Sequence, residues 1–387
     1  MKNSPSARQS AARHPIIEVV LHPAITLVCL LILFTLIFFG TLYQTEHGLF
    51  EAQKKFFGYG LVLIGEFFPL PAASLVLWVL SIQLAALMAV RLPWKPAKAG
   101  LWVVHLGIMS LLVGGFITQV MAVESQLTLA EGEEGQYSTS YQDWELAFWE
   151  TSGDSNRVLA FDAGALPAGT MAELAPYRAT LRIAVNYPNC DAFTEESGKT
   201  GADKQEIVYL NASNVAVLEA RKPEKEVTQN VPGLLFTLSE PGRDARHILL
   251  YGAESQPLSL MMGGRRVFCQ LRLKHYPMNF SLKLTDFVKN VHPGTDVPSS
   301  FESYADLREQ GGSRQVKVWM NNPLRHQGYT FFQASYVQPP GMAERSTFAV
   351  VTNPGRVLPY VSSLVVFVGL LLHFLLKLVP FIRQEAV

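Results

Sequence analysis

Two histidines lie inside long apolar segments of the sequence, and their chemistry is the most informative of any side chains in the chain. His105 lies one turn into a segment that begins at Leu101, and His373 lies one turn before Lys377 at the end of another. An ionisable group inside a membrane is costly unless it is paired or neutral. Neutral imidazole is the common protein ligand of haem iron, so either histidine could bind haem. The alternative is a neutral histidine hydrogen-bonded to a neighbouring carbonyl group.

The two histidines are expected at similar depths in the membrane. His105 is about five residues from the cytoplasmic start of its segment and His373 about four residues from Lys377, so each lies about 6–8 Å from the inner boundary. A haem held by both imidazoles needs their α-carbons within about 14 Å of each other. Equal depth therefore predicts a shared haem only if the two helices also pack together.

Small residues form a stripe along the segment that contains His105. Gly107, Ser110 and Gly114 recur at spacings of i, i+3 and i+7, which allows another helix to pack closely. At about 100° per residue, His105 points about 200° from Gly107. The histidine is therefore predicted to face something other than the helix that packs on the stripe.

Signatures of a self-contained enzyme are absent from the sequence. It contains no GxSxG, no HExxH, no phosphate-binding glycine loop and no Cys/His group with zinc spacing. The acidic run at Glu131, Glu133 and Glu134 is typical of a solvated surface. Cys190 and Cys269 form neither CxxC nor CxxCH, so we expect either a structural disulfide between them or two free thiols. We therefore expect no catalytic residues and no hydrolase or nucleotide chemistry.

Four long apolar segments are predicted to cross a membrane. Each is close to the ~20 apolar residues that span a ~30 Å hydrocarbon core. The first is too long for the apolar part of a cleaved signal peptide and has no small-residue cleavage site, so we expect it to be retained. The segments are residues 24–43, 72–90, 101–121 and 358–376.

Basic residues set the expected orientation of these spans. They precede the first span, separate the second from the third and follow the fourth, which predicts that those segments and both termini are cytoplasmic. Residues 44–71 and 122–356 then lie on the other side, the periplasm, and an amphipathic helix near 48–60 is expected in the outer interface. Because the amino terminus does not resemble a transit peptide, we expect a bacterial inner membrane. The basic residues are Lys2, Arg8, Arg13, Arg91, Lys95, Lys98, Lys377 and Arg383.

Residues 122–356 have the pattern of an all-β domain. Short runs alternate apolar and polar residues and are separated by Pro, Gly, Asn and Asp, as in antiparallel sheets. We expect a sandwich-like fold, in one or two lobes, between an amino-terminal membrane region (1–121) and a fourth span with a cytoplasmic tail (357–387). The runs include 177–185, 267–275, 281–287, 315–319 and 329–336.

Motifs spread along the chain resemble those of a known family. Phe39-Gly-Thr-Leu-Tyr-Gln and Gly48-Leu-Phe-Glu-Ala-Gln-Lys-Lys-Phe-Phe are followed by His105-Leu-Gly and Glu124-Ser-Gln-Leu-Thr-Leu-Ala-Glu-Gly-Glu. Phe280-Ser-Leu-Lys-Leu-Thr-Asp-Phe and Asn321-Asn-Pro-Leu-Arg-His-Gln-Gly-Tyr-Thr-Phe-Phe-Gln-Ala-Ser-Tyr precede the last apolar segment. In this order they resemble the ResB (CcsB) family of cytochrome c biogenesis proteins, whereas residues 150–270 carry no such motif.

The resemblance implies a role in the System II pathway, which attaches haem to CxxCH apocytochromes outside the membrane. ResB proteins work with a CcsA-like partner that carries a tryptophan-rich haem-handling segment, which this chain lacks. It implies a subunit of a holocytochrome c synthase complex that transports or transiently binds haem b. The expected partners are the CcsA-like protein, apocytochrome c, haem and the lipid bilayer. His105 matches the family's third-span histidine at a haem site, whereas His373 is a candidate from its depth alone.

Two other classes of function fit parts of the sequence. A membrane redox subunit would hold haem between His105 and His373 and exchange electrons with quinone. A non-enzymatic scaffold would use the β-rich domain to assemble other proteins, with structural histidines. A nucleic-acid partner is not expected, because 32 basic and 32 acidic side chains give a formal net charge of zero.

Overall fold

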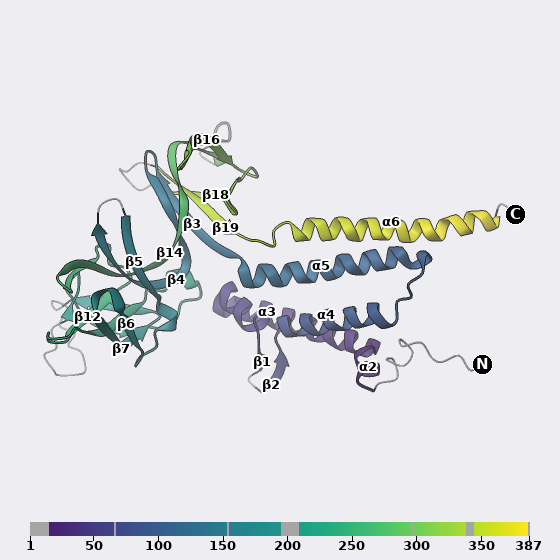
Figure 1. Ribbon diagram of the computed structural model, residues 1–387, viewed down its shortest axis with the longest axis horizontal. Coiled ribbons are helices and arrows are strands. Elements are labelled where there is room, and N and C mark those ends of the chain that lie inside the picture. Colours follow the sequence, from purple (N-terminus) through teal and green to yellow (C-terminus); the bar gives the residue numbers. More distant parts are fainter. Residues whose placement is uncertain are drawn as a thin grey trace. The chain divides into compact units, whose positions relative to one another are not determined.

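The protein is described by a computed structural model that covers residues 15–65, 67–152, 155–194, 209–295, 298–337 and 344–385. The chain divides into two compact units, a helical one formed by Met1–Val123 with Thr352–Val387, and a β unit formed by Glu124–Val351. Figure 1 shows the helices and strands of each. The predicted fold class, four membrane helices with a large all-β domain, is confirmed.

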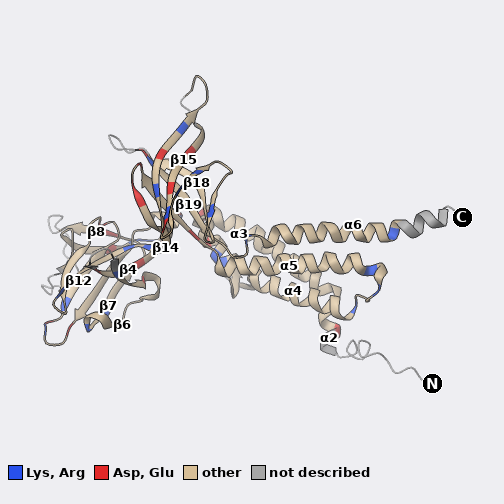
Figure 2. Ribbon diagram, turned by 45° about the horizontal axis from the view of Figure 1, so that its top comes forward, with Lys and Arg blue, Asp and Glu red and all other residues tan. Residues whose placement is uncertain are grey.

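The helical unit contains four helices that are long and apolar enough to cross a membrane in the described part of the chain. Three predicted spans lie within one of them, and the span 72–90 begins one residue before its helix. Figure 2 shows that the charged residues lie near helix ends, on α2 and on the β unit, while the lengths of the spans are uncharged. These features identify an integral membrane protein. The helices are α2 (Pro15–Val20), α3 (Pro23–Phe57), α4 (Ala73–Val90), α5 (Ala99–Met121) and α6 (Leu358–Glu385), with a short 3-10 turn at Pro96–Lys98.

Helix α3 consists of two limbs that meet at Gly48. This glycine has φ 79° and ψ 164°, a conformation that interrupts the helix. The second limb turns back and packs against the first. A β-carbon on Gly40 would lie 3.5 Å from the Phe56 ring, and the ring centroids of Tyr43 and Phe56 are 5.5 Å apart. The predicted amphipathic helix forms this limb, and an unpredicted hairpin of β1 (Leu61–Ile64) and β2 (Phe68–Pro71) joins it to α4.

Helices α5 and α6 pack antiparallel along the predicted stripe of small residues. A β-carbon on Gly107 would lie 2.6 Å from Cγ2 of Val366, and one on Gly114 would lie 2.8 Å from Cβ of Leu358. Only a residue without a side chain permits backbones to approach so closely. The prediction that another helix packs on this stripe is confirmed, and that helix is α6.

The β unit is built on two long antiparallel strands, β4 and β14. They belong to a large sheet with the order β16-β15-β14-β4-β3-β19-β18-β17, while a five-stranded sheet has the order β6-β7-β11-β12-β9. The strands are β3 (Val123–Ala130), β4 (Glu134–Ser152), β5 (Ser155–Asp162), β6 (Met171–Leu174), β7 (Ala179–Tyr187), β8 (Cys190–Thr194), β9 (Tyr209–Leu210), β10 (Val215–Ala220), β11 (Gly233–Ser239), β12 (Arg246–Tyr251), β13 (Leu258–Met262), β14 (Arg265–Val291), β15 (Pro298–Glu309), β16 (Gly312–Trp319), β17 (Leu324–His326), β18 (Tyr329–Val337) and β19 (Arg345–Thr352).

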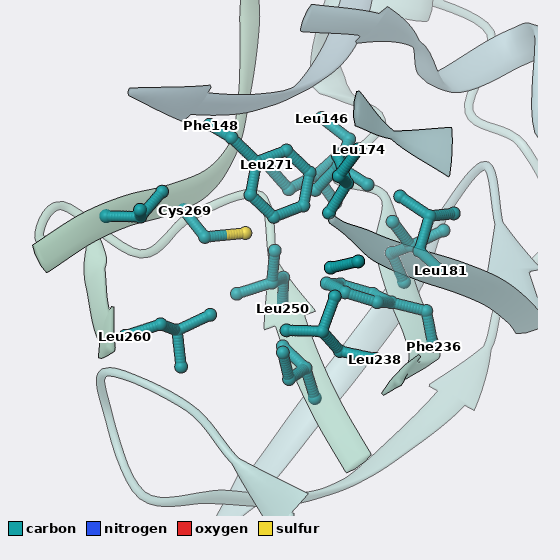
Figure 3. Packing of buried hydrophobic residues seen from close by; sticks show 14 of the residues in the cluster. Leu146, Phe148, Leu174, Leu181, Phe236, Leu238, Leu250, Leu260, Cys269 and Leu271 are labelled. Atoms are coloured by element: carbon teal, nitrogen blue, oxygen red, sulfur yellow. The ribbon is translucent and has the colours of Figure 1, made fainter. Parts of the chain in front are cut away.

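Two separate hydrophobic cores divide the β unit into two lobes. The pairing of β14 with β4 shifts register between Leu273 and His275 and again between Pro277 and Leu282. Such irregularities bend strands. Residues of β14 before the bend, including Cys269, pack with Phe148 and Phe236 in the first core, part of which Figure 3 shows. Later residues of β14 pack in the second core with Phe331 and Phe348. One long strand therefore contributes to both cores.

The two cysteines of the β unit are buried in different clusters. Cys269 lies in the first core, whereas Cys190 packs with Leu218 and Leu249 in a small satellite cluster. Both thiols are free. Burial raises the pKa of Cys190 to about 11 and that of Cys269 well above its usual value, so both stay protonated at neutral pH. Of the two predicted alternatives, the structure has the free thiols.

Candidate functional site

His105 lies in the first turns of α5 and is partly buried. Its Nδ1 lies 2.6 Å from the carbonyl oxygen of Leu101, one turn earlier in the same helix. A carbonyl oxygen only accepts hydrogen bonds, so Nδ1 carries the proton in this contact. The lone pair is then on Nε2, the tautomer that a metal-binding histidine with a backbone acceptor adopts. The same bond would also satisfy a purely structural histidine.

The imidazole of His105 lies on the same side of α5 as Phe116 and Gln119, two later residues of this helix that contact α4. At about 100° per residue, Phe116 lies within about 20° of His105 around the helix and Gln119 within about 40°. Phe116 stacks on Trp78 of α4 with ring centroids 4.2 Å apart, and Gln119 Nε2 donates to Ser74 Oγ over 2.7 Å. The histidine therefore faces away from the stripe that contacts α6, as predicted.

His373 is on the face of α6 that contacts α5. A β-carbon on Gly100 would lie 2.5 Å from Cα of His373, so the two backbones touch there. The Nδ1 atom of His373 is buried and has no hydrogen-bond partner among the described residues. A buried polar atom without a partner is costly. At the α5–α6 contact, the Nδ1 atom of His373 is therefore a buried polar atom without a hydrogen-bond partner among the described residues.

The distance between the two histidines permits a shared haem, but their directions do not favour one. A β-carbon on Gly100 would lie 2.5 Å from Cα of His373, so the α-carbons of these two residues are within about 4 Å of each other. Residues five apart in a helix are about 9 Å apart, so the α-carbons of His105 and His373 are within about 13 Å. However, His373 packs against the side of α5 that contacts α6, whereas the side chain of His105 projects from the opposite side of α5. The ligand roles of both histidines stay predictions.

Polar residues that the sequence analysis overlooked link the helices of this unit. Gln119 Nε2 also donates to the carbonyl oxygen of Phe57 over 3.0 Å. Near the other end of α4, Gln83 accepts from Thr26 and donates to the carbonyl oxygen of His22. Both glutamines stand in apolar segments of the sequence, so a search for neutral polar residues, and not only ionisable ones, would have found them.

The β unit offers no comparable cluster of ligands. No group of three His, Cys, Asp or Glu residues suited to a metal ion occurs among the residues that the structure describes. His275 stacks on Tyr137 with ring centroids 4.1 Å apart, at the bend of β14. Burial, together with the positive charge of Arg272, lowers the pKa of His275 to about 4. This histidine is neutral at pH 7 and serves packing at the bend.

Comparison with known proteins addresses the β unit most directly. The model of the ResB-like family matches residues 259–345. The predicted resemblance to ResB is confirmed. The matched ResB region runs from β13 to the start of β19 and includes neither His105 nor His373. The chain is also 24% identical over 275 residues to Protein NrfI of Wolinella succinogenes, an alignment that covers 70% of this chain and 27% of NrfI. The chain thus spans about a quarter of the length of that relative.

Proposed function

We propose that this protein is a ResB-type subunit of the membrane machinery that matures c-type cytochromes. The ResB match in the β unit and the similarity to NrfI support this role. The helical unit supports it as well, since its helices can cross a membrane and carry histidines within their spans. The protein is proposed to handle haem as cargo for thioether attachment within a complex, and not to act through a self-contained active site.

The observation that carries the haem proposal is the hydrogen bond of His105. Its Nδ1 contact with the Leu101 carbonyl leaves the Nε2 lone pair available on a side of α5 that α6 does not cover. A neutral imidazole held in this way has the tautomer and the fixed orientation that haem iron requires of an axial ligand. Because His373 faces a different side of α5, the second ligand is proposed to come from a CcsA-like partner.

The proposed role of the β unit is to hold the apocytochrome close to haem. Confining both reactants replaces a slow encounter by a reaction within one complex. This role requires the β unit to lie on the periplasmic side of the inner membrane, as the basic residues predict. An exported reporter enzyme inserted at the exposed turn that contains Gly242 should be active. Activity of a reporter that works only in the cytoplasm would overturn the orientation and the proposed function with it.

Replacement of His105 tests the haem proposal. His105→Ala should lower the haem recovered with the purified protein and partner by more than half, and imidazole should restore part of the function by filling the vacant position. His47→Ala, at the exposed end of the first limb of α3, is the matched control and should leave haem unchanged.

The corresponding His373→Ala variant separates the two ligand schemes. Equal haem loss in both variants would support one haem shared by the two rings. Loss in His105→Ala alone would support a second ligand from the partner. Unchanged haem and spectrum in His105→Ala would return this histidine to a structural role, and normal c-type cytochromes in a deletion strain would contradict the maturation function itself.

A further inference from the structure

The two limbs of α3 enclose a cleft that the proposed function does not use. Its volume is about 630 Å³, within the range of small-molecule sites. It lies at the end of the helical unit where α3 turns back at Gly48, and Gln119 of α5 closes one side. Its lining includes Ile37, Gln44, Phe50, Gln53, Lys54 and Gln119.

Contacts within the helical unit hold the walls of this cleft in place. The Phe56 ring packs against Gly40, and its centroid lies 5.5 Å from that of the Tyr43 ring. The end of the second limb is fixed because the Phe57 carbonyl oxygen accepts hydrogen bonds from Gln119 and from Ser74 Oγ. The cleft is thus built by interactions that do not depend on a ligand.

The lining combines an apolar surface with donors and one positive charge. Ile37 and Phe50 contribute apolar surface, whereas Gln44 and Gln53 contribute amide donors. Lys54 is the only charged residue of the described lining. Neighbouring Lys55 is not part of this lining, and its Nζ lies 4.1 Å from the centre of the Tyr43 ring. A molecule that complements this cleft has an apolar body and a negatively charged group.

Two observations favour a lipid over a porphyrin. The described lining contains no His, Cys, Met or Tyr, so the usual axial ligands of haem iron are lacking. The cleft also opens towards hydrocarbon, since Ile37 belongs to a membrane span and is 54% exposed, and Leu49 at the start of the second limb is 52% exposed. A basic side chain at the membrane surface attracts anionic lipid head groups.

We propose that this cleft binds an anionic phospholipid, with its phosphate group near Lys54 and an acyl chain against Ile37 and Phe50. The lipid fills the space between the limbs and stabilises the turned-back conformation of α3. This site is separate from His105 and does not depend on the proposed function.

The pair Lys54 and Lys55 provides a matched test. Dioleoylphosphatidylglycerol is added to the full-length protein in detergent, and bound lipid is counted by native mass spectrometry. Lys54→Gln should weaken binding about fivefold, which corresponds to the ~1 kcal/mol that one lysine contributes at an anionic membrane surface. Lys55→Gln removes the same charge outside the cleft and should leave binding unchanged. Equal loss in both variants would mean general charge attraction and overturn the proposal.

A second variant tests the location through volume instead of charge. Ile37→Trp places a large ring in the cleft, and binding of the same lipid should fall at least tenfold while both lysines are retained. Unchanged binding would place the lipid elsewhere. Zinc protoporphyrin is the competing probe. If it displaces the lipid from the unmodified protein, and its own binding is lost in Ile37→Trp, the cleft is a porphyrin site and the lipid assignment is wrong.

Discussion

The interior of the helical unit and the interior of the β unit are stabilised by different kinds of packing. Between α5 and α6 the closest contacts involve backbone at Gly100, Gly107 and Gly114. In the β unit the two cores are filled by large side chains such as Phe148 and Phe331, which are fully buried. The difference follows the solvent that each unit is expected to meet.

This contrast shows what drives association in each environment. Water favours burial of apolar surface, so large side chains stabilise the β unit. Lipid chains are as apolar as leucine, so helices in a membrane gain from close backbone approach and from interhelical hydrogen bonds. The same substitution is therefore expected to have different consequences in the two units.

The largest effect is expected from truncation in the first core of the β unit. Phe148 makes edge-to-face contacts with Phe161 and Phe236, with ring centroids 6.5 and 6.3 Å away. Phe148→Ala should lower the free energy of unfolding by about 3–5 kcal/mol, because it removes apolar burial and leaves a cavity. Urea unfolding followed by tryptophan fluorescence measures it. Phe332→Ala is the control, since Phe332 is 40% exposed and should cost less than about 1 kcal/mol.

The next effect concerns pH and the bend of β14. The pKa of His275 is lowered from 6.5 to about 4, so the unfolded chain binds a proton that the folded protein does not bind between these values. Stability is therefore complete above pH 6.5 and falls as the pH drops to about 4, by up to about 3 kcal/mol. His275→Gln should flatten the dependence of the unfolding free energy on pH, whereas His292→Gln, in an exposed position, should not. A pH profile unchanged by His275→Gln would contradict the prediction.

A smaller effect is expected from added bulk between α5 and α6. In Gly107→Leu, even the first atom of the new side chain, the β-carbon, would lie only 2.6 Å from Val366. The substitution should lower the free energy of unfolding by about 1–3 kcal/mol. Gly115 is the matched control, because a β-carbon there meets nothing within 4 Å. Unfolding by sodium dodecyl sulfate in mixed micelles compares the variants. Equal destabilisation by Gly115→Leu would show that close α5–α6 approach is not the cause.

The smallest effect is the hydrogen bond between the same two helices. Ser362 Oγ donates to Ser110 Oγ over 3.0 Å. A double-mutant cycle with Ser110→Ala and Ser362→Ala in the same unfolding assay should give a coupling energy of about 0.6 kcal/mol, typical of interhelical hydrogen bonds in membranes. A coupling of several kcal/mol would mean that polar contacts, and not glycine packing, dominate this interface.

Regular patterns were readable from the sequence, whereas interruptions of them were not. The predicted runs 267–275 and 281–287 belong to one strand, β14, because register shifts carry the chain through Tyr276–Phe280 without ending the sheet. The sequence predicted a span that ends at residue 43 and a separate helix near 48–60, but not that this helix folds back onto the span. The fold-back rests on contacts of Phe56 with Gly40 and Tyr43, which are 13 or more positions away from Phe56.

For the candidate site, the sequence identified the residues but not how they face each other. His105 and His373 were recognisable because ionisable groups are rare in apolar segments. The angle between His105 and the small-residue stripe was also readable, since it follows from helical geometry alone. That α6 packs on this stripe, with His373 against Gly100, required the structure.

The membrane helices, the β-rich character of residues 122–356 and the resemblance to ResB could be predicted from residue patterns alone, since hydropathy, alternation and motifs are local properties of a chain. The structure was needed to show which helices touch, that β14 contributes to two cores, that both thiols are free and that α3 folds back to form a cleft. These features depend on contacts between distant residues, whose free energies arise from shape and close approach and not from the type of any one residue.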